Sequence, residues 1–90
     1  MYLVVYDIKK DSLRARFAKF LKQYGNRIQY SVFEIRNSPR ILDNIKVEMK
    51  NYYEQRFSQS DSVLVFRIPD NAEVQRFGYP TNEEDDLVIL

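Results

Sequence analysis

Residues 2–8, Tyr-Leu-Val-Val-Tyr-Asp-Ile, carry apolar side chains at both odd and even positions. Because the side chains of a β-strand alternate between the two faces of its sheet, this segment predicts a central strand that is buried on both faces. Such a strand needs partners along both edges and cover on both faces, and the rest of the chain must supply them. Asp7 is the one charged residue in the segment.

Two amphipathic helices are predicted from the spacing of apolar side chains. Residues 11–24 repeat apolar residues at helical intervals, with Asp11 as the expected N-cap and Gly25 as the expected C-terminal stop. Ser38 followed by Pro39 is typical of a helix start, because the proline lacks an amide hydrogen that the first turn would leave unbonded. This second helix is expected to run to about Arg56.

The remaining segments predict strands around these helices. Residues 26–36 read as one strand whose apolar alternation changes phase, so we expect a bulge or tight bend at 31–33. Residues 61–68 predict a further strand, and 72–77 a short one. This order predicts an α+β sandwich of the ferredoxin-like type, with one mainly antiparallel sheet and both helices on one face.

The C-terminal end differs from the rest of the chain. We expect a single ferredoxin-like domain over 1–82, followed at 83–90 by an acidic linker and a final apolar strand, 87–90. Four aliphatic residues in a row resemble an edge strand that adds to a sheet, either of the same chain or of a partner subunit. A disordered terminus is the alternative.

The composition excludes several kinds of chemistry. The chain has no Cys and no His, so a disulfide framework, a zinc finger and a Ser-His or Cys-His catalytic pair are ruled out. Its two glycines, Gly25 and Gly78, are too few for a P-loop or a dinucleotide-binding fingerprint. Any metal would need oxygen ligands, which favours hard ions such as Mg²⁺, Ca²⁺ or Mn²⁺.

No segment of the sequence resembles a membrane span. The longest apolar run, 1–6, is far shorter than the ~20 residues that cross a bilayer, and no charged region precedes it as in a signal peptide. We therefore expect a cytoplasmic protein with no membrane partner.

Positive charge is concentrated in the first two thirds of the chain. Residues 1–60 hold 12 basic and 6 acidic side chains, whereas residues 61–90 hold 2 basic and 7 acidic ones. The densest basic cluster consists of Lys9, Lys10, Arg14, Arg16 and Arg27. Fixed cations of this kind bind phosphate groups, and arginine does so with bidentate geometry. A solvated surface is the alternative interpretation.

Asp7 is the most distinctive single residue. A carboxylate at the end of a buried strand must be hydrogen-bonded, ion-paired or metal-bound to offset its desolvation. One carboxylate is a poor metal site, but Mg²⁺ needs only one or two, so a symmetric dimer that brings two copies of Asp7 together would suffice. The alternative is that Asp7 caps the turn that follows it.

Four segments also carry a resemblance to a known family. They are Tyr-Asp-Ile at 6–8, Asp-Ser-Leu-Arg-Ala-Arg at 11–16, Tyr-Gly-Asn-Arg at 24–27 and, above all, Arg-Ile-Gln-Tyr-Ser-Val-Phe-Glu at 27–34. In order and spacing these segments resemble the CRISPR-associated Cas-two family (Cas2). The likeness extends over essentially the whole chain, including the late Asp-Ser-Val strand and the apolar tail.

The resemblance implies a homodimer of ferredoxin-like subunits that acts with the Cas-one integrase (Cas1) in acquiring new spacers for antiviral defence. Duplex DNA, and in some members single-stranded RNA, is the implied nucleic-acid partner. Some members are described as magnesium-dependent endonucleases. Asp7 is then the metal-binding and catalytic residue, with Mg²⁺ or Mn²⁺ between its two copies, and Tyr6 is the second catalytic candidate. The expected nucleic-acid-binding residues are Arg14, Arg16, Arg27, Lys9, Lys10 and Phe33, of which the two lysines lie in the loop before the first helix.

Three functions remain open from the sequence. The protein could be a DNA-bridging subunit of the spacer-acquisition complex, or a metal-dependent phosphodiesterase in its own right. A toxin-like ribonuclease of the same fold, outside CRISPR, is the third. The lack of a second acidic residue near Asp7 argues against rapid catalysis by a single chain.

Overall fold

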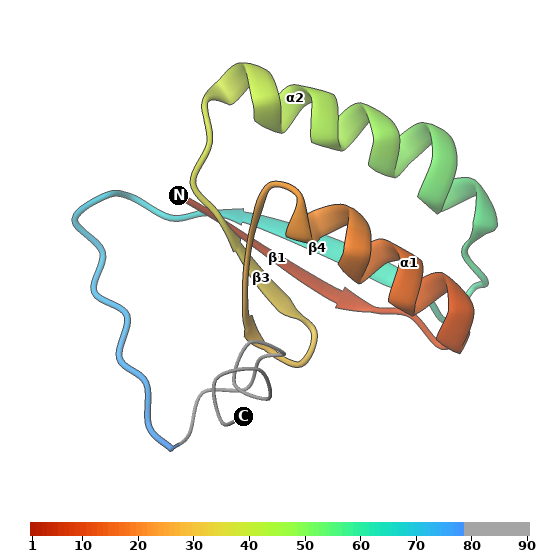
Figure 1. Cartoon of the computed structure of the whole chain (residues 1–90), viewed down its shortest axis with the longest axis horizontal. Coiled ribbons are helices and arrows are strands. Elements are labelled where there is room, and N and C mark those ends of the chain that lie inside the picture. The colour runs from red at the N-terminus through yellow and green to blue at the C-terminus, as the bar shows by residue number, and fades with distance from the viewer. Residues whose placement is uncertain (79–90) are drawn as a thin grey trace, which may run out of the picture.

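The chain folds as two helices packed on a four-stranded sheet (Figure 1). The structure is a computed structural model and describes residues 1–78. Its elements are β1 (Tyr2–Asp7), α1 (Asp11–Lys22), β2 (Gly25–Gln29), β3 (Val32–Ile35), α2 (Pro39–Glu48) and β4 (Ser62–Arg67). After α2 the chain continues through a π-helical turn, η1 (Met49–Tyr53), and a 3₁₀ turn, η2 (Glu54–Arg56).

The sheet has the strand order β2-β3-β1-β4, and every neighbouring pair is antiparallel. Both helices cover the same face, because the core combines side chains of one sheet face with side chains of α1 and α2. These residues are Val4, Tyr6, Phe33 and Ile35 from the sheet, and Leu13, Phe17, Leu21 and Ile45 from the helices. The predicted ferredoxin-like α+β sandwich is thereby confirmed.

The central position of β1 is confirmed, but its predicted burial on both faces is wrong for the single chain. Leu3 and Val5 lie on the face away from the helices and remain half-exposed. In register with them on β4, Phe66 is 47% exposed and Leu64 55%. No helix of the described residues covers this face. Asp7 lies on it too, because it has the same parity in β1 as Leu3 and Val5. We call the surface formed by Leu3, Val5, Asp7, Leu64 and Phe66 the open sheet face.

The predicted single strand at 26–36 is in fact a hairpin. Strands β2 and β3 are separated by Tyr30 and Ser31, and their register shifts between Arg27 and Gln29. The change in apolar phase therefore reflects a reversal of the chain together with an irregularity in β2. The expected bulge or tight bend at 31–33 thus corresponds to a full reversal of the chain at Tyr30 and Ser31. The sequence did not identify it as a hairpin turn because it contains neither Gly nor Pro, the usual signals of a tight reversal.

Two details of helix α1 differ from the prediction. The N-cap is Lys10, with no side-chain cap hydrogen bond, and Asp11 is the first helical residue. The helix ends at Lys22, so Gly25 is not its stop but the first residue of β2. A Cβ atom there would lie 2.1 Å from the carbonyl oxygen of Glu34 on β3, so glycine is needed for close backbone approach.

The predicted start of the second helix is confirmed. Ser38 Oγ accepts a hydrogen bond of 3.3 Å from the amide of Ile41, and Pro39 occupies the first turn. The short strand predicted at 72–77 is wrong, because this segment has no sheet partner among residues 1–78, and Val74 and Phe77 are 60% and 86% exposed. The predicted boundary at 82, the acidic linker and the strand at 87–90 lie outside the described residues. No helix within residues 1–78 is long and apolar enough to cross a membrane.

Candidate nucleic-acid interface

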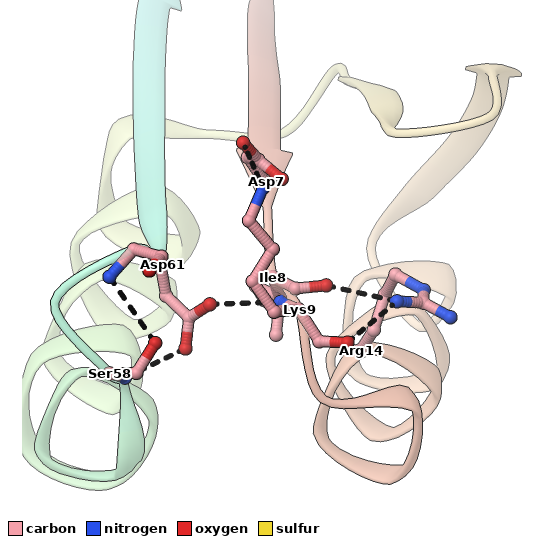
Figure 2. A network of polar contacts seen from close by, with 7 residues as sticks. Asp7, Ile8, Lys9, Arg14, Ser58 and Asp61 are labelled. Carbon is pink, nitrogen blue, oxygen red and sulfur yellow. Dashed lines mark hydrogen bonds and ion pairs between the residues drawn. The ribbon is translucent and has the colours of Figure 1, made fainter.

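Asp7 stands at the end of β1 on the open sheet face. Its side chain is 63% exposed, and both carboxylate oxygens accept hydrogen bonds from Lys9 Nζ, at 2.8 and 3.0 Å (Figure 2). The expectation of a desolvated carboxylate is therefore wrong for the single chain, although the expected ion pair is present. Because the pair is solvent-exposed, it contributes little to stability.

The turn after β1 is capped by Asp61 rather than by Asp7. Asp61 accepts hydrogen bonds of 2.8 Å from the backbone amides of Lys9 and Ser58, so its carboxylate joins the end of β1 to the loop before β4 (Figure 2). These two backbone hydrogen bonds, that of Lys9 first, lower the pKa of the Asp61 carboxyl. Sequence reasoning missed this residue, although Ser-x-x-Asp spacing is a known local capping signal.

Replacing Asp61 by Asn should flatten the loss of stability in acid. Since the pKa of Asp61 is lower in the folded state than its ordinary value of 3.8, its contribution is complete above that value and is lost as the pH falls through the folded pKa. We therefore expect urea midpoints of the wild type to fall more steeply than those of Asp61→Asn between about pH 5 and pH 2. Asp43→Asn, an exposed change on α2, is the control, and parallel curves for Asp61→Asn and wild type would contradict the assignment.

Arg14 and Arg27 line an open pocket of about 630 Å³ between α1 and the β2-β3 hairpin. We call it the α1–β2 pocket. Its other polar lining residues are Tyr6, Asp11, Lys19, Lys22 and Tyr30. Arg14 is held in place at the start of α1, where it donates hydrogen bonds to the carbonyl of Ile8 (3.0 Å) and to Asp11 (2.5 Å). The pocket therefore combines four cationic side chains with one carboxylate, that of Asp11.

Tyr6 and Phe33 both belong to the core, and Tyr6 also lines the α1–β2 pocket. Tyr6 is 3% exposed and packs edge-on against Phe17 at a centroid distance of 5.0 Å. Burial raises the pKa of the Tyr6 hydroxyl, against the opposing effect of Arg27, so it stays a neutral phenol near pH 7. Phe33 is fully buried, and the guanidinium carbon of Arg27 lies 5.3 Å from its ring centroid. In this chain Phe33 therefore supports Arg27 and has no surface with which to contact nucleic acid itself.

The structure does not bring all the predicted site residues together. Asp7 and Tyr6 are consecutive in β1, so Tyr6 points under the helices while Asp7 lies on the open sheet face. Arg16 follows Arg14 by two residues, which places it on the other side of α1. There it lines a second pocket, together with Lys10 and with Arg56, a residue that sequence reasoning did not include.

The acidic side chains of residues 1–78 do not cluster as metal ligands. Within residues 1–78 no three Asp or Glu side chains come together as potential ligands. Asp7 alone is exposed at the end of the open sheet face, where a second subunit facing it would add a second carboxylate. Two carboxylates and water are a suitable ligand set for Mg²⁺. The residues therefore fit a shared site but not one within a single subunit.

The fold and the pockets define a class of protein, a ferredoxin-like sandwich with a cationic pocket on each side of its first helix. Comparison with known proteins then gives the family. The family model described as CRISPR associated protein Cas2 matches residues 1–76. The CRISPR-associated endonuclease Cas2 2 of one Thermus thermophilus strain is 31% identical over 90 residues, which cover 100% of this chain and 96% of that protein.

Two further comparisons agree. The CRISPR-associated endoribonuclease Cas2 of another Thermus thermophilus strain is 37% identical over 73 residues, covering 80% of this chain and 74% of that protein. The crystal structure of Streptococcus pyogenes Cas2 at pH 6.5 superposes with a TM-score of 0.70 at 26% identity, covering 86% of this chain and 98% of that one. The chain belongs to the CRISPR-associated Cas2 family.

Proposed function

We propose that this protein is the dimeric, nucleic-acid-binding Cas2 subunit that acts with the Cas1 integrase when new spacers are acquired. We also propose that it has divalent-cation-dependent endonuclease activity. Family membership supports the CRISPR role, and several relatives are named endonucleases or endoribonucleases. The observation that carries the proposal is the open sheet face, which is apolar along two strands and ends in Asp7.

The open sheet face supports a face-to-face homodimer. On this face the exposed Leu64 and Phe66 of β4 are in register with the partly buried Val5 and Leu3 of β1, and apolar surfaces of this kind are typical of protein interfaces. Burying this surface against a second copy would place Asp7 of each subunit at the interface. Strand 87–90, which is outside the described residues, would add to the partner's sheet in the same assembly.

The shared site would be formed by Asp7 of both subunits, with Mg²⁺ or Mn²⁺ as the ion. When bound, such an ion supplies charge neutralisation and activation of water for phosphodiester hydrolysis. Lys9 must first release Asp7, because its ammonium group occupies both carboxylate oxygens in the single chain. Arg14 and Arg27 lie on the helix-covered side of the sheet and bind and orient backbone phosphates.

The nucleic-acid role is tested by removing two charges from the α1–β2 pocket. In Arg14→Gln with Arg27→Gln, each lost phosphate contact should lower the salt slope of log K by about 0.9, so we expect a decrease of about 1.8 for duplex DNA. Binding should weaken for all sequences alike. Fluorescence anisotropy over a range of salt concentrations measures both quantities, and a melting curve verifies that the variant is folded.

Arg40→Gln with Lys46→Gln on α2 is the charge-matched control for this experiment. These two residues are exposed and lie on the other helix, outside the α1–β2 pocket. If the α2 variant loses the salt slope while the pocket variant keeps it, the nucleic-acid surface lies on α2 and the proposed interface is wrong.

A further inference from the structure

A second cationic pocket lies on the opposite side of α1. It has a volume of about 340 Å³ and is lined by Lys10, Ser12, Leu13, Arg16 and Arg56. Three of its five lining residues are cations and none is acidic. Lys10 and Ser12 come from the start of α1, whereas Arg56 comes from η2, some 40 residues later in the chain. We call it the Arg16–Arg56 pocket.

One aromatic side chain, Tyr52 in the π-helical turn η1, holds both arginines of this pocket. The guanidinium carbon of Arg56 lies 3.7 Å from the Tyr52 ring centroid, and Arg56 Nη1 donates a 2.6 Å hydrogen bond to the Tyr52 carbonyl. Arg16 Nη1 donates to the Tyr52 hydroxyl. The two guanidinium groups are therefore held by the same side chain, Arg56 over the ring and Arg16 at the hydroxyl.

Tyr52 is in turn fixed by the core. Its ring packs edge-on against Tyr53 at a centroid distance of 4.8 Å, and Tyr53 is 3% exposed. Tyr53 itself packs against Phe17 and Phe20, both at 5.0 Å. Because the arginines are held before a ligand arrives, binding an anion costs less side-chain entropy than it would for free surface arginines. Bringing two like charges to one ring also raises the local positive potential.

We propose that Arg56, with Arg16 and Lys10, binds a phosphodiester group of the nucleic-acid backbone, so that α1 offers a phosphate pocket on each side. This inference rests on the proposed nucleic-acid-binding function and adds Arg56, which lies outside the four segments that carry the family resemblance. Planar guanidinium groups match phosphate oxygens, and Ser12 adds a neutral hydroxyl donor. Arg14 and Arg16 then contact different phosphates of one ligand, because α1 separates their pockets.

The test compares Arg56→Gln with Lys50→Gln by duplex binding at several salt concentrations. Lys50 carries the same charge as Arg56 and precedes it in the chain, but it pairs with Glu54 and does not line the pocket. Arg56→Gln should lower the salt slope by about 0.9 and weaken binding roughly fivefold to tenfold near 0.1 M salt, whereas Lys50→Gln should change neither by that amount. Tyr52→Phe keeps the ring and every charge, so it should weaken binding severalfold at an unchanged slope.

Three outcomes would count against the proposal in different ways. If wild-type protein fails to bind duplex DNA or RNA, the proposed function itself is wrong. If the wild type binds but Arg56→Gln behaves like Lys50→Gln, the pocket is not a backbone contact. Titration with inorganic phosphate against chloride at equal ionic strength covers the remaining case: phosphate binding that depends on Arg56, with duplex binding unaffected, would assign the pocket to a free anion.

Discussion

Truncation of Phe17 to Ala should lower the free energy of unfolding by about 3–5 kcal/mol, a large part of the 5–15 kcal/mol typical of a domain. Phe17 is fully buried and packs edge-on against Tyr6 and Tyr53, each at 5.0 Å. Its removal leaves a cavity beneath α1 that rigid aromatic neighbours cannot fill. Urea unfolding followed by circular dichroism measures the loss.

Lys19→Ala is the matched control, because Lys19 is exposed on the same helix and alanine favours helix formation. Its effect should stay within about 0.5 kcal/mol. A loss below about 1 kcal/mol for Phe17→Ala would mean that the core closes around the gap. We expect Phe17→Ala to weaken nucleic-acid binding as well as stability. Phe17 packs against Tyr6, which lines the α1–β2 pocket, and against Tyr53, which supports the Tyr52 side chain that holds Arg16 and Arg56.

Replacement of Asp7 by Asn should reduce any divalent-cation-dependent cleavage of RNA or duplex DNA by at least about 100-fold. Asparagine keeps the shape of the side chain but removes the negative charge that a hard cation requires. Nucleic-acid binding should persist, because the proposed interface uses arginines on the other side of the sheet. Dimerisation should also persist, because the proposed dimer buries apolar surface.

The measurement is cleavage of labelled RNA and duplex DNA by wild type and Asp7→Asn purified side by side, with Asp43→Asn as a carboxylate control. Equal cleavage by all three proteins would place the activity elsewhere or in a contaminant. If none of them cleaves, the endonuclease proposal fails and the DNA-bridging role remains. That role is then tested directly, by asking whether both wild type and Asp7→Asn support integration of DNA fragments by the cognate Cas1.

The two helices and strands β1 and β4 were predictable because they depend on local patterns. The apolar run in β1, the Ser38-Pro39 helix start and the helical spacing in α1 each lie within a few residues. The hairpin at 25–35 was predicted only as a bulge or bend within one strand, because its turn residues, Tyr30 and Ser31, include neither Gly nor Pro. Residues 72–77 have strand-like composition, but they have no strand partner among residues 1–78, and a strand exists only where another strand pairs with it.

The candidate site was predicted less well, for geometric reasons. Helical and strand periodicity already imply that Arg14 and Arg16, like Tyr6 and Asp7, point in different directions, but closeness in sequence led to the prediction of one cluster. Arg56 and Tyr52 meet Arg16 only through tertiary packing, across some 40 residues of chain, and no local motif reports such a contact. Asp61 did have a local signal, in its spacing from Ser58.

The ion pair between Asp7 and Lys9 bears on the order of events in the proposed dimer. With its own lysine in place, the end of each sheet is close to electrically neutral, so two subunits can meet there without bringing uncompensated negative charges together. Association then needs no added cation, and each carboxylate becomes available only after its lysine rotates away. Assembly and hydrolysis would accordingly be separate steps, and a subunit could complete the first in cells where the second never occurs.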